Sequence, residues 1–128
     1  MILLLHTLIE AAVGILFLFY PNADDLVPGF GTSEGESFEL LMAMYGLAAL
    51  FLATLSLITY LRRADRTLFL VVTLSLCVFH VSMSVIQAFG NPDSRAMLLH
   101  FLLGIFLGGQ YINRRRMEWN NTIDRGIG

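Results

Sequence analysis

Four long runs of apolar residues, separated by short polar connections, fill most of the 128-residue chain. The runs cover residues 2–20, 38–61, 67–89 and 96–113. A helix of about 20 apolar residues crosses the roughly 30 Å hydrocarbon core of a bilayer. The pattern therefore predicts an all-α fold, an integral membrane four-helix bundle that forms a single transmembrane domain over residues 1–128. Short turns make neighbouring spans antiparallel.

Composition supports the membrane assignment and narrows the chemistry. The chain is 56% hydrophobic and 14% charged, whereas soluble domains carry about 25% charged residues. The single cysteine, Cys77, excludes an intramolecular disulfide and CxxC redox chemistry. No nucleophile–base pair, phosphate-binding loop or HExxH motif is present, so we expect a non-enzymatic protein without catalytic residues. A nucleic-acid partner is not expected.

The charges predict an orientation. Arg62, Arg63 and Arg66 lie between the second and third runs, and three further arginines, at 114–116, follow the fourth. The connection at 21–37 carries acidic residues and no base. Basic residues in short loops stay on the cytoplasmic side of a membrane. We therefore predict a multi-pass protein of the cell inner membrane with both termini cytoplasmic.

Small residues recur at helical spacing in two of the runs, which allows helix backbones to approach closely in lipid. The second run contains Gly46, Ala49, Ala53 and Ser56. In the fourth run, Gly104 and Gly108 form a GxxxG pattern. Packing inside one bundle is the favoured interpretation, and homodimerisation through Gly104 and Gly108 is the alternative.

Ionisable side chains inside the apolar runs are the strongest functional indication. His6 and Glu10 lie in the first run, His80 in the third and His100 in the fourth. A charge at the centre of a bilayer costs on the order of 2.5 kcal/mol or more, so such residues usually face the interior of a bundle. His6 and Glu10 are four apart and share one helix face.

Counting depth at 1.5 Å per residue from the arginine-bearing ends divides these residues into two groups. His80 and His100 fall about 20 Å deep, and Glu10 about 12 Å deep. The outer group predicts a polar ligand pocket that consists of Tyr45, His80, Ser84 and His100. The inner group, His6 with Glu10, is predicted to lie too far below this level for direct contact.

Three interpretations of the histidines follow. In the first, they hold the helices together through hydrogen bonds. In the second, His80 and His100 hold a haem b or, with Met83 and Met97, a copper ion. In the third, Glu10 belongs to a proton pathway of a small transporter component.

The leading prediction needs no cofactor. It is a non-enzymatic membrane protein whose polar pocket binds a lipid or quinone-like amphiphile, or which serves as an accessory subunit of a larger membrane complex. Besides the lipid bilayer itself, a membrane-complex partner is therefore expected.

The layout resembles that of the small bacterial four-helix membrane proteins of the DoxX-like group. The likeness covers Gly14 and Pro21 in and after the first run, residues 39–46, the Arg62-Arg63 turn and residues 100–104. It implies a four-helix membrane bundle. Some members of that group are associated with quinone-linked or thiosulfate redox complexes, so the resemblance also implies an oxidoreductase setting. The single cysteine and the lack of a cofactor motif add no support for that activity.

Overall fold

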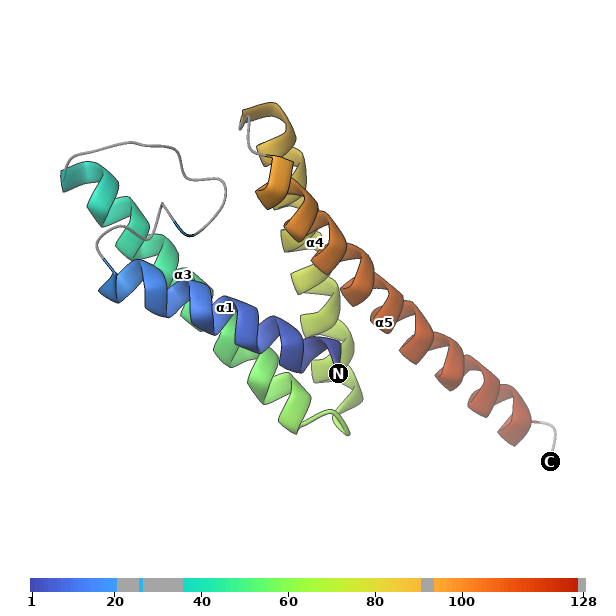
Figure 1. Cartoon of the computed structure of the whole chain (residues 1–128). Helices are drawn as coiled ribbons and strands as arrows, with labels where there is room; N and C mark the ends of the chain where they lie inside the picture. Colours follow the sequence, from blue (N-terminus) through green and yellow to red (C-terminus); the bar gives the residue numbers. More distant parts are fainter. Residues whose placement is uncertain (21–25, 27–35, 91–93, 127–128) are drawn as a thin grey trace.

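A computed structural model of the chain has four helices within residues 1–20, 36–90 and 94–126 (Figure 1). They are α1 (Ile2–Phe19), α3 (Glu36–Leu61), α4 (Arg66–Gly90) and α5 (Ser94–Gly126). The structure describes residues 1–20, 26, 36–90 and 94–126, without the side chains of 36, 37 and 118–126. Within these residues there is no strand, which confirms the all-α prediction. Most of the acidic connection and the centre of the last turn, both predicted to face outward, lie outside the described residues.

All four helices are long and apolar enough to cross a membrane. The candidate spans are Ile2–Phe19, Phe38–Leu61, Arg66–Gly90 and Ser94–Met117. The multi-pass prediction is thereby supported, while the inner membrane and the side on which the termini lie stay predictions.

The fourth helix is longer than the apolar run at 96–113 that predicts its span. Helix α5 continues through Arg114, Arg115 and Arg116 to Gly126. Arginine is a good helix former, and no proline or turn signal interrupts the chain after residue 113. The loss of hydrophobicity therefore marks the end of the apolar segment but not the end of the helix.

Helices α1 and α3 form one antiparallel pair. Gly14 of α1 lies against Gly46 of α3, so closely that a Cβ on Gly14 would come within 2.8 Å of the Gly46 carbonyl oxygen. Ala49 and Ala53, which follow Gly46 at helical spacing, are buried. The small-residue stripe of the second run thus packs two helices of the same chain together.

Helices α4 and α5 form the second antiparallel pair. A Cβ on Gly104 would meet the Val81 side chain at 2.9 Å, and one on Gly108 would meet the Cys77 sulfur at 3.2 Å. The Cys77 thiol donates a hydrogen bond to the Gly104 carbonyl oxygen at 3.3 Å. Both glycines of the GxxxG pattern therefore face α4, as the favoured interpretation predicted. Homodimerisation through them stays a prediction.

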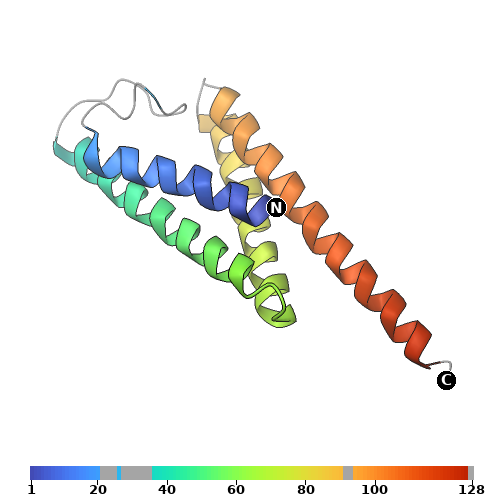
Figure 2. The ribbon, with the colours of Figure 1, turned by 60° about the horizontal axis from the view of Figure 1, so that its bottom comes forward.

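The two pairs meet near the N-terminus of α1 and separate toward its C-terminal end (Figures 1 and 2). A cluster of buried apolar residues lies where they meet: Leu3, Phe69, Val72, Leu76 and Leu107. Leu3 is only the second residue of α1 to be helical, whereas Leu76 is ten residues into α4. The N-terminus of α1 therefore lies beside a middle turn of α4 and not beside the start of α4.

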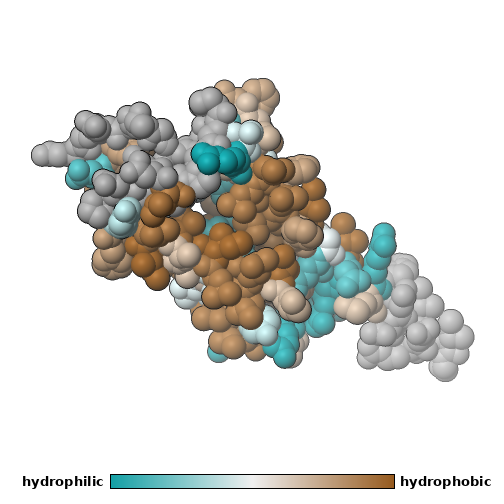
Figure 3. Space-filling model, viewed as in Figure 1, coloured by the Kyte–Doolittle hydropathy of each residue, from teal (hydrophilic) through white to brown (hydrophobic). Residues whose placement is uncertain are grey.

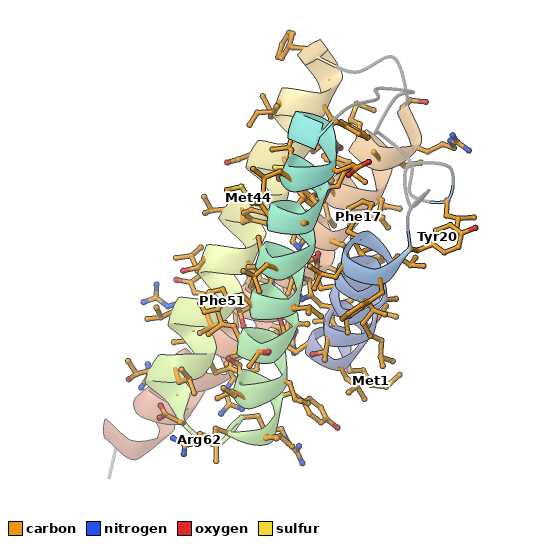
Figure 4. All side chains as sticks on the ribbon, turned by 90° about the vertical axis from the view of Figure 1, so that its left-hand side faces the viewer. Met1, Phe17, Tyr20, Met44, Phe51 and Arg62 are labelled. Carbon is orange, nitrogen blue, oxygen red and sulfur yellow. The ribbon has the colours of Figure 1, made fainter. Side chains whose placement is uncertain are left out.

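The outer surface is apolar over the four helices. Met44 and Phe51 point away from α3 and are 61% and 67% exposed (Figure 4). Figure 3 shows hydrophobic residues over the centre of the molecule and hydrophilic ones toward the C-terminal part of α5. Soluble monomers rarely expose so large a continuous apolar surface, which suits contact with lipid.

Candidate functional site

The α1–α3 pair contributes three neighbouring polar side chains to the candidate site. His6 and Glu10 lie one turn apart on the buried face of α1, 0% and 6% exposed. Ser56, at the end of the small-residue stripe of α3, is also fully buried. Its hydroxyl oxygen lies 2.7 Å from Nδ1 of His6. The small residues of α3 let α1 come close enough for this hydrogen bond.

The α4–α5 pair contributes two more histidines. Nδ1 of His80 lies 2.8 Å from Nδ1 of His100, so the two imidazoles share one hydrogen bond. Their rings stack with centroids 5.1 Å apart and an interplanar angle of 27°. One turn further along α4, the Ser84 hydroxyl donates to the Met97 carbonyl oxygen at 3.1 Å. The hydrogen bond and the ring stacking hold His80 and His100 together between α4 and α5.

The two halves join through His6 and His80. Their Nε2 atoms are 2.6 Å apart, and their rings meet edge to face with centroids 4.8 Å apart. Glu10 Oε1 lies 3.8 Å from Nε2 of His6 and 3.7 Å from Nε2 of His80. Side chains from all four helices therefore form one buried unit, here named the histidine cluster. Its members are His6, Glu10, Ser56, His80 and His100.

The predicted separation into an outer and an inner group is thus wrong. The depth count assumed that all helices begin at one plane. Because Leu3 packs with Val72 and Leu76, the start of α1 lies roughly 15 Å along α4 by the rise per residue. This displacement brings His6 to the level of His80, so the two make direct contact.

No relay through the hydroxyls of α4 is needed to connect the groups. Ser75 donates to the carbonyl oxygen of Val71 at 2.9 Å. Thr73 is buried, and its hydroxyl has no hydrogen-bond partner among the described residues. Neither hydroxyl bridges the histidine pairs.

The remaining predicted pocket residues have other contacts. The Tyr45 ring packs edge to face on Phe17, with centroids 5.5 Å apart, and lies within electrostatic range of Glu10. Ser84 uses its hydroxyl on the backbone of α5. Met83 and Met97, the predicted copper ligands, are half-buried. The structure thus joins His80 with His100 as predicted and adds His6, Glu10 and Ser56 to them.

The histidine cluster has few N–H groups that can donate hydrogen bonds. A neutral imidazole carries one N–H, and its other nitrogen is an acceptor. If His6 donates from Nδ1 to Ser56 and His80 donates from Nδ1 to His100, both Nε2 atoms present lone pairs to each other at 2.6 Å. Two facing lone pairs repel, so this arrangement calls for a proton or a metal cation between them.

Three donor atoms surround that position: Nε2 of His6, Nε2 of His80 and Oε1 of Glu10. The three distances between them define a triangle whose corners are each about 2.0 Å from a common centre. Zinc binds imidazole nitrogen at about 2.0–2.1 Å and carboxylate oxygen at about 2.0–2.2 Å. A metal ion of this size fits between the donors.

Sequence reasoning assigned Ser56 to helix packing only. It is the one hydroxyl-bearing member of the stripe formed by Gly46, Ala49 and Ala53, and this was the available signal. A hydroxyl on a buried helix face has to find a hydrogen-bond partner. Which partner it finds depends on the register of α1 against α3.

Comparisons of the chain with protein-family models, with curated proteins and with solved structures found no match. The resemblance to the DoxX-like group therefore stays a prediction. Function has to be argued from the histidine cluster itself.

Proposed function

We propose that this is an integral membrane protein that binds a divalent transition-metal ion at His6, Glu10 and His80. One observation carries the proposal: the triangle formed by two imidazole nitrogens and one carboxylate oxygen, buried between four apolar helices. Imidazole nitrogens suit zinc, iron, copper and nickel, and two histidines with one carboxylate form a recurrent ligand set for zinc and ferrous iron.

The neighbours of the two histidines support this role. Histidines that bind metals almost always donate their second ring N–H to another group, which fixes the tautomer and the ring orientation. Ser56 provides that acceptor for His6, and His100 provides it for His80. His100 is therefore a positioning residue in this proposal and not a ligand.

Electrostatics also favours a cation at this place. Glu10 is 6% exposed within an apolar helix, where an isolated carboxylate is costly. A divalent cation bound by the carboxylate and the two imidazoles offsets that cost. Tetrahedral ligands lie about 3.3 Å apart at zinc–nitrogen bond lengths, so binding spreads the two imidazoles by less than about 1 Å.

The geometry favours an ion over the two larger ligands considered from the sequence. In a bis-histidine haem the two ligating rings lie on opposite faces of the macrocycle, whereas a hydrogen bond joins His80 directly to His100. The head of a quinone or lipid would likewise have to part imidazoles that bond to one another. A single ion needs much less rearrangement.

Metal analysis tests the proposal. We purify the chain in mild detergent, remove metals with a chelator, and titrate the protein with Zn²⁺ while elemental analysis measures the ratio of metal to chain. We expect one ion per chain, lost in His6→Ala and His80→Ala and weakened at least about tenfold in Glu10→Gln. Glu39→Gln is the matched control, because Glu39 is an exposed residue outside the cluster. Equal zinc binding by Glu10→Gln, Glu39→Gln and the parent protein would contradict the assignment of Glu10.

A second candidate function, proton transfer, is favoured by the continuity of the same contacts. Ser56, His6, His80 and His100 form a continuous chain of contacts. In the tautomers that carry a proton along it, His6 and His80 each accept on one nitrogen and donate from the other. In proteoliposomes with a pH gradient, we expect His80→Gln to abolish proton flux and Glu39→Gln to leave it unchanged. Flux that is insensitive to His80→Gln refutes this role.

A further inference from the structure

A second polar site lies away from the histidine cluster, at the end of the molecule where the arginines gather. A cavity of about 430 Å³ opens between the α3–α4 turn, the start of α4 and α5. Its lining is Arg63, Ala64, Phe69, Gln110, Asn113, Arg114 and Met117. Two arginines therefore line one space, together with Gln110 and Asn113.

Arg63 comes from the α3–α4 turn and Arg114 from α5, and both side chains are held in place. The Arg114 guanidinium donates to the Arg63 carbonyl oxygen at 3.4 Å and lies over the Phe69 ring, 5.5 Å from its centroid. The Arg63 guanidinium lies over the Tyr60 ring at 5.2 Å. Side chains that are ordered in this way can bind an oxyanion with little loss of rotamer freedom.

We propose that this cavity binds the headgroup of an anionic phospholipid. Guanidinium groups bind phosphate oxygens through charge-assisted, often bidentate hydrogen bonds. Basic pockets between transmembrane helices near the cytoplasmic surface bind lipid headgroups in this way.

Size and position favour a lipid over a free ion. A water molecule occupies about 30 Å³ of liquid, so the cavity has room for far more than one inorganic phosphate. Met117, which lines the cavity, is 48% exposed, and Leu61, two residues before Arg63, is 68% exposed. Acyl chains can therefore lie on apolar surface beside the bound headgroup.

Lipid titration in neutral detergent tests the proposal, with native mass spectrometry of the full chain to measure bound lipid. The Arg63→Gln/Arg114→Gln protein is compared with Arg62→Gln/Arg116→Gln, which loses the same charge from exposed residues outside the cavity. We expect phosphatidylglycerol affinity to fall about 30-fold in the first protein, from two basic groups, and less than about threefold in the second. Equal weakening in the two proteins overturns the site, because it indicates diffuse charge attraction.

Two further ligands separate the components of the proposal. Phosphatidylcholine is expected to bind much more weakly than phosphatidylglycerol, and equal binding overturns the need for an anion. If inorganic phosphate displaces the lipid at equal concentration, the site is one for free phosphate and the lipid assignment fails. Circular dichroism of the same proteins, with helix content and thermal unfolding equal to those of the parent protein, shows that the Arg63→Gln/Arg114→Gln chain is folded.

Discussion

Gly14→Ala should loosen the contact that places α1 in the histidine cluster. The new Cβ would lie 2.6 Å from Cγ of Leu50 and 2.8 Å from the carbonyl oxygen of Gly46. The Leu50 side chain can rotate away, but the carbonyl oxygen belongs to the backbone of α3. The two helices must therefore move apart until this separation grows from 2.8 Å to at least 3.4 Å, where ordinary contact begins.

The expected magnitude follows from these contacts. Forcing an extra methyl group into a well-packed interface costs about 1–3 kcal/mol. Alanine also favours a helix over glycine by about 1 kcal/mol, which offsets part of that cost. Gly109→Ala in α5 is the matched control, because a Cβ there meets nothing within 4 Å and only the helix preference changes. The free energy of unfolding of Gly14→Ala should be about 1–3 kcal/mol lower than that of Gly109→Ala.

Reversible unfolding in mixed detergent micelles, followed by circular dichroism, measures this difference. Glu10 lies one turn before Gly14, so Zn²⁺ affinity should fall together with stability in Gly14→Ala. If Gly14→Ala is as stable as Gly109→Ala and binds zinc equally well, the close approach of α1 and α3 does not position the site.

Three further outcomes are expected. Ser56→Ala removes the partner of Nδ1 of His6 and should weaken Zn²⁺ binding about 10–100-fold in a competition titration, and unchanged affinity speaks against an ordering role for this hydroxyl. His100→Ala should weaken binding by a similar factor while one ion per chain still binds at saturation, whereas loss of all binding makes His100 a ligand. Thr73→Val removes a buried hydroxyl without a partner among the described residues, so the free energy of unfolding should stay equal or rise; a loss of more than about 1 kcal/mol refutes this.

The four helices could be predicted from the sequence, because the length and hydrophobicity of a segment alone identify an apolar span. It also placed His80 level with His100, since both lie on neighbouring helices joined by a short turn. The small residues at 46, 49 and 53 indicated correctly that α3 packs closely against a neighbour. These features depend on local pattern and on short connections.

The position of α1 could not be predicted in the same way. Its level relative to α4 depends on lateral packing of Leu3 against Val72 and Leu76, which are far away in the sequence. The depth count misplaces α1 along α4 by about 15 Å, so it predicts that His6 and His80 do not touch. In the structure, the Nε2 atoms of the two histidines are 2.6 Å apart. The role of Ser56 depends on the same register and was missed for the same reason.

X-ray absorption spectroscopy of the zinc-loaded protein tests the metal site most directly, because it identifies the atoms bound to the ion. The proposed ligands predict nitrogen and oxygen neighbours at about 2.0–2.1 Å, an imidazole signature from two histidines, and no sulfur. Glu10→Gln should change this first shell, and Glu39→Gln should not. A sulfur neighbour, or an imidazole signature that disappears in His100→Ala but persists in His6→Ala, would contradict the assignment of His6, Glu10 and His80.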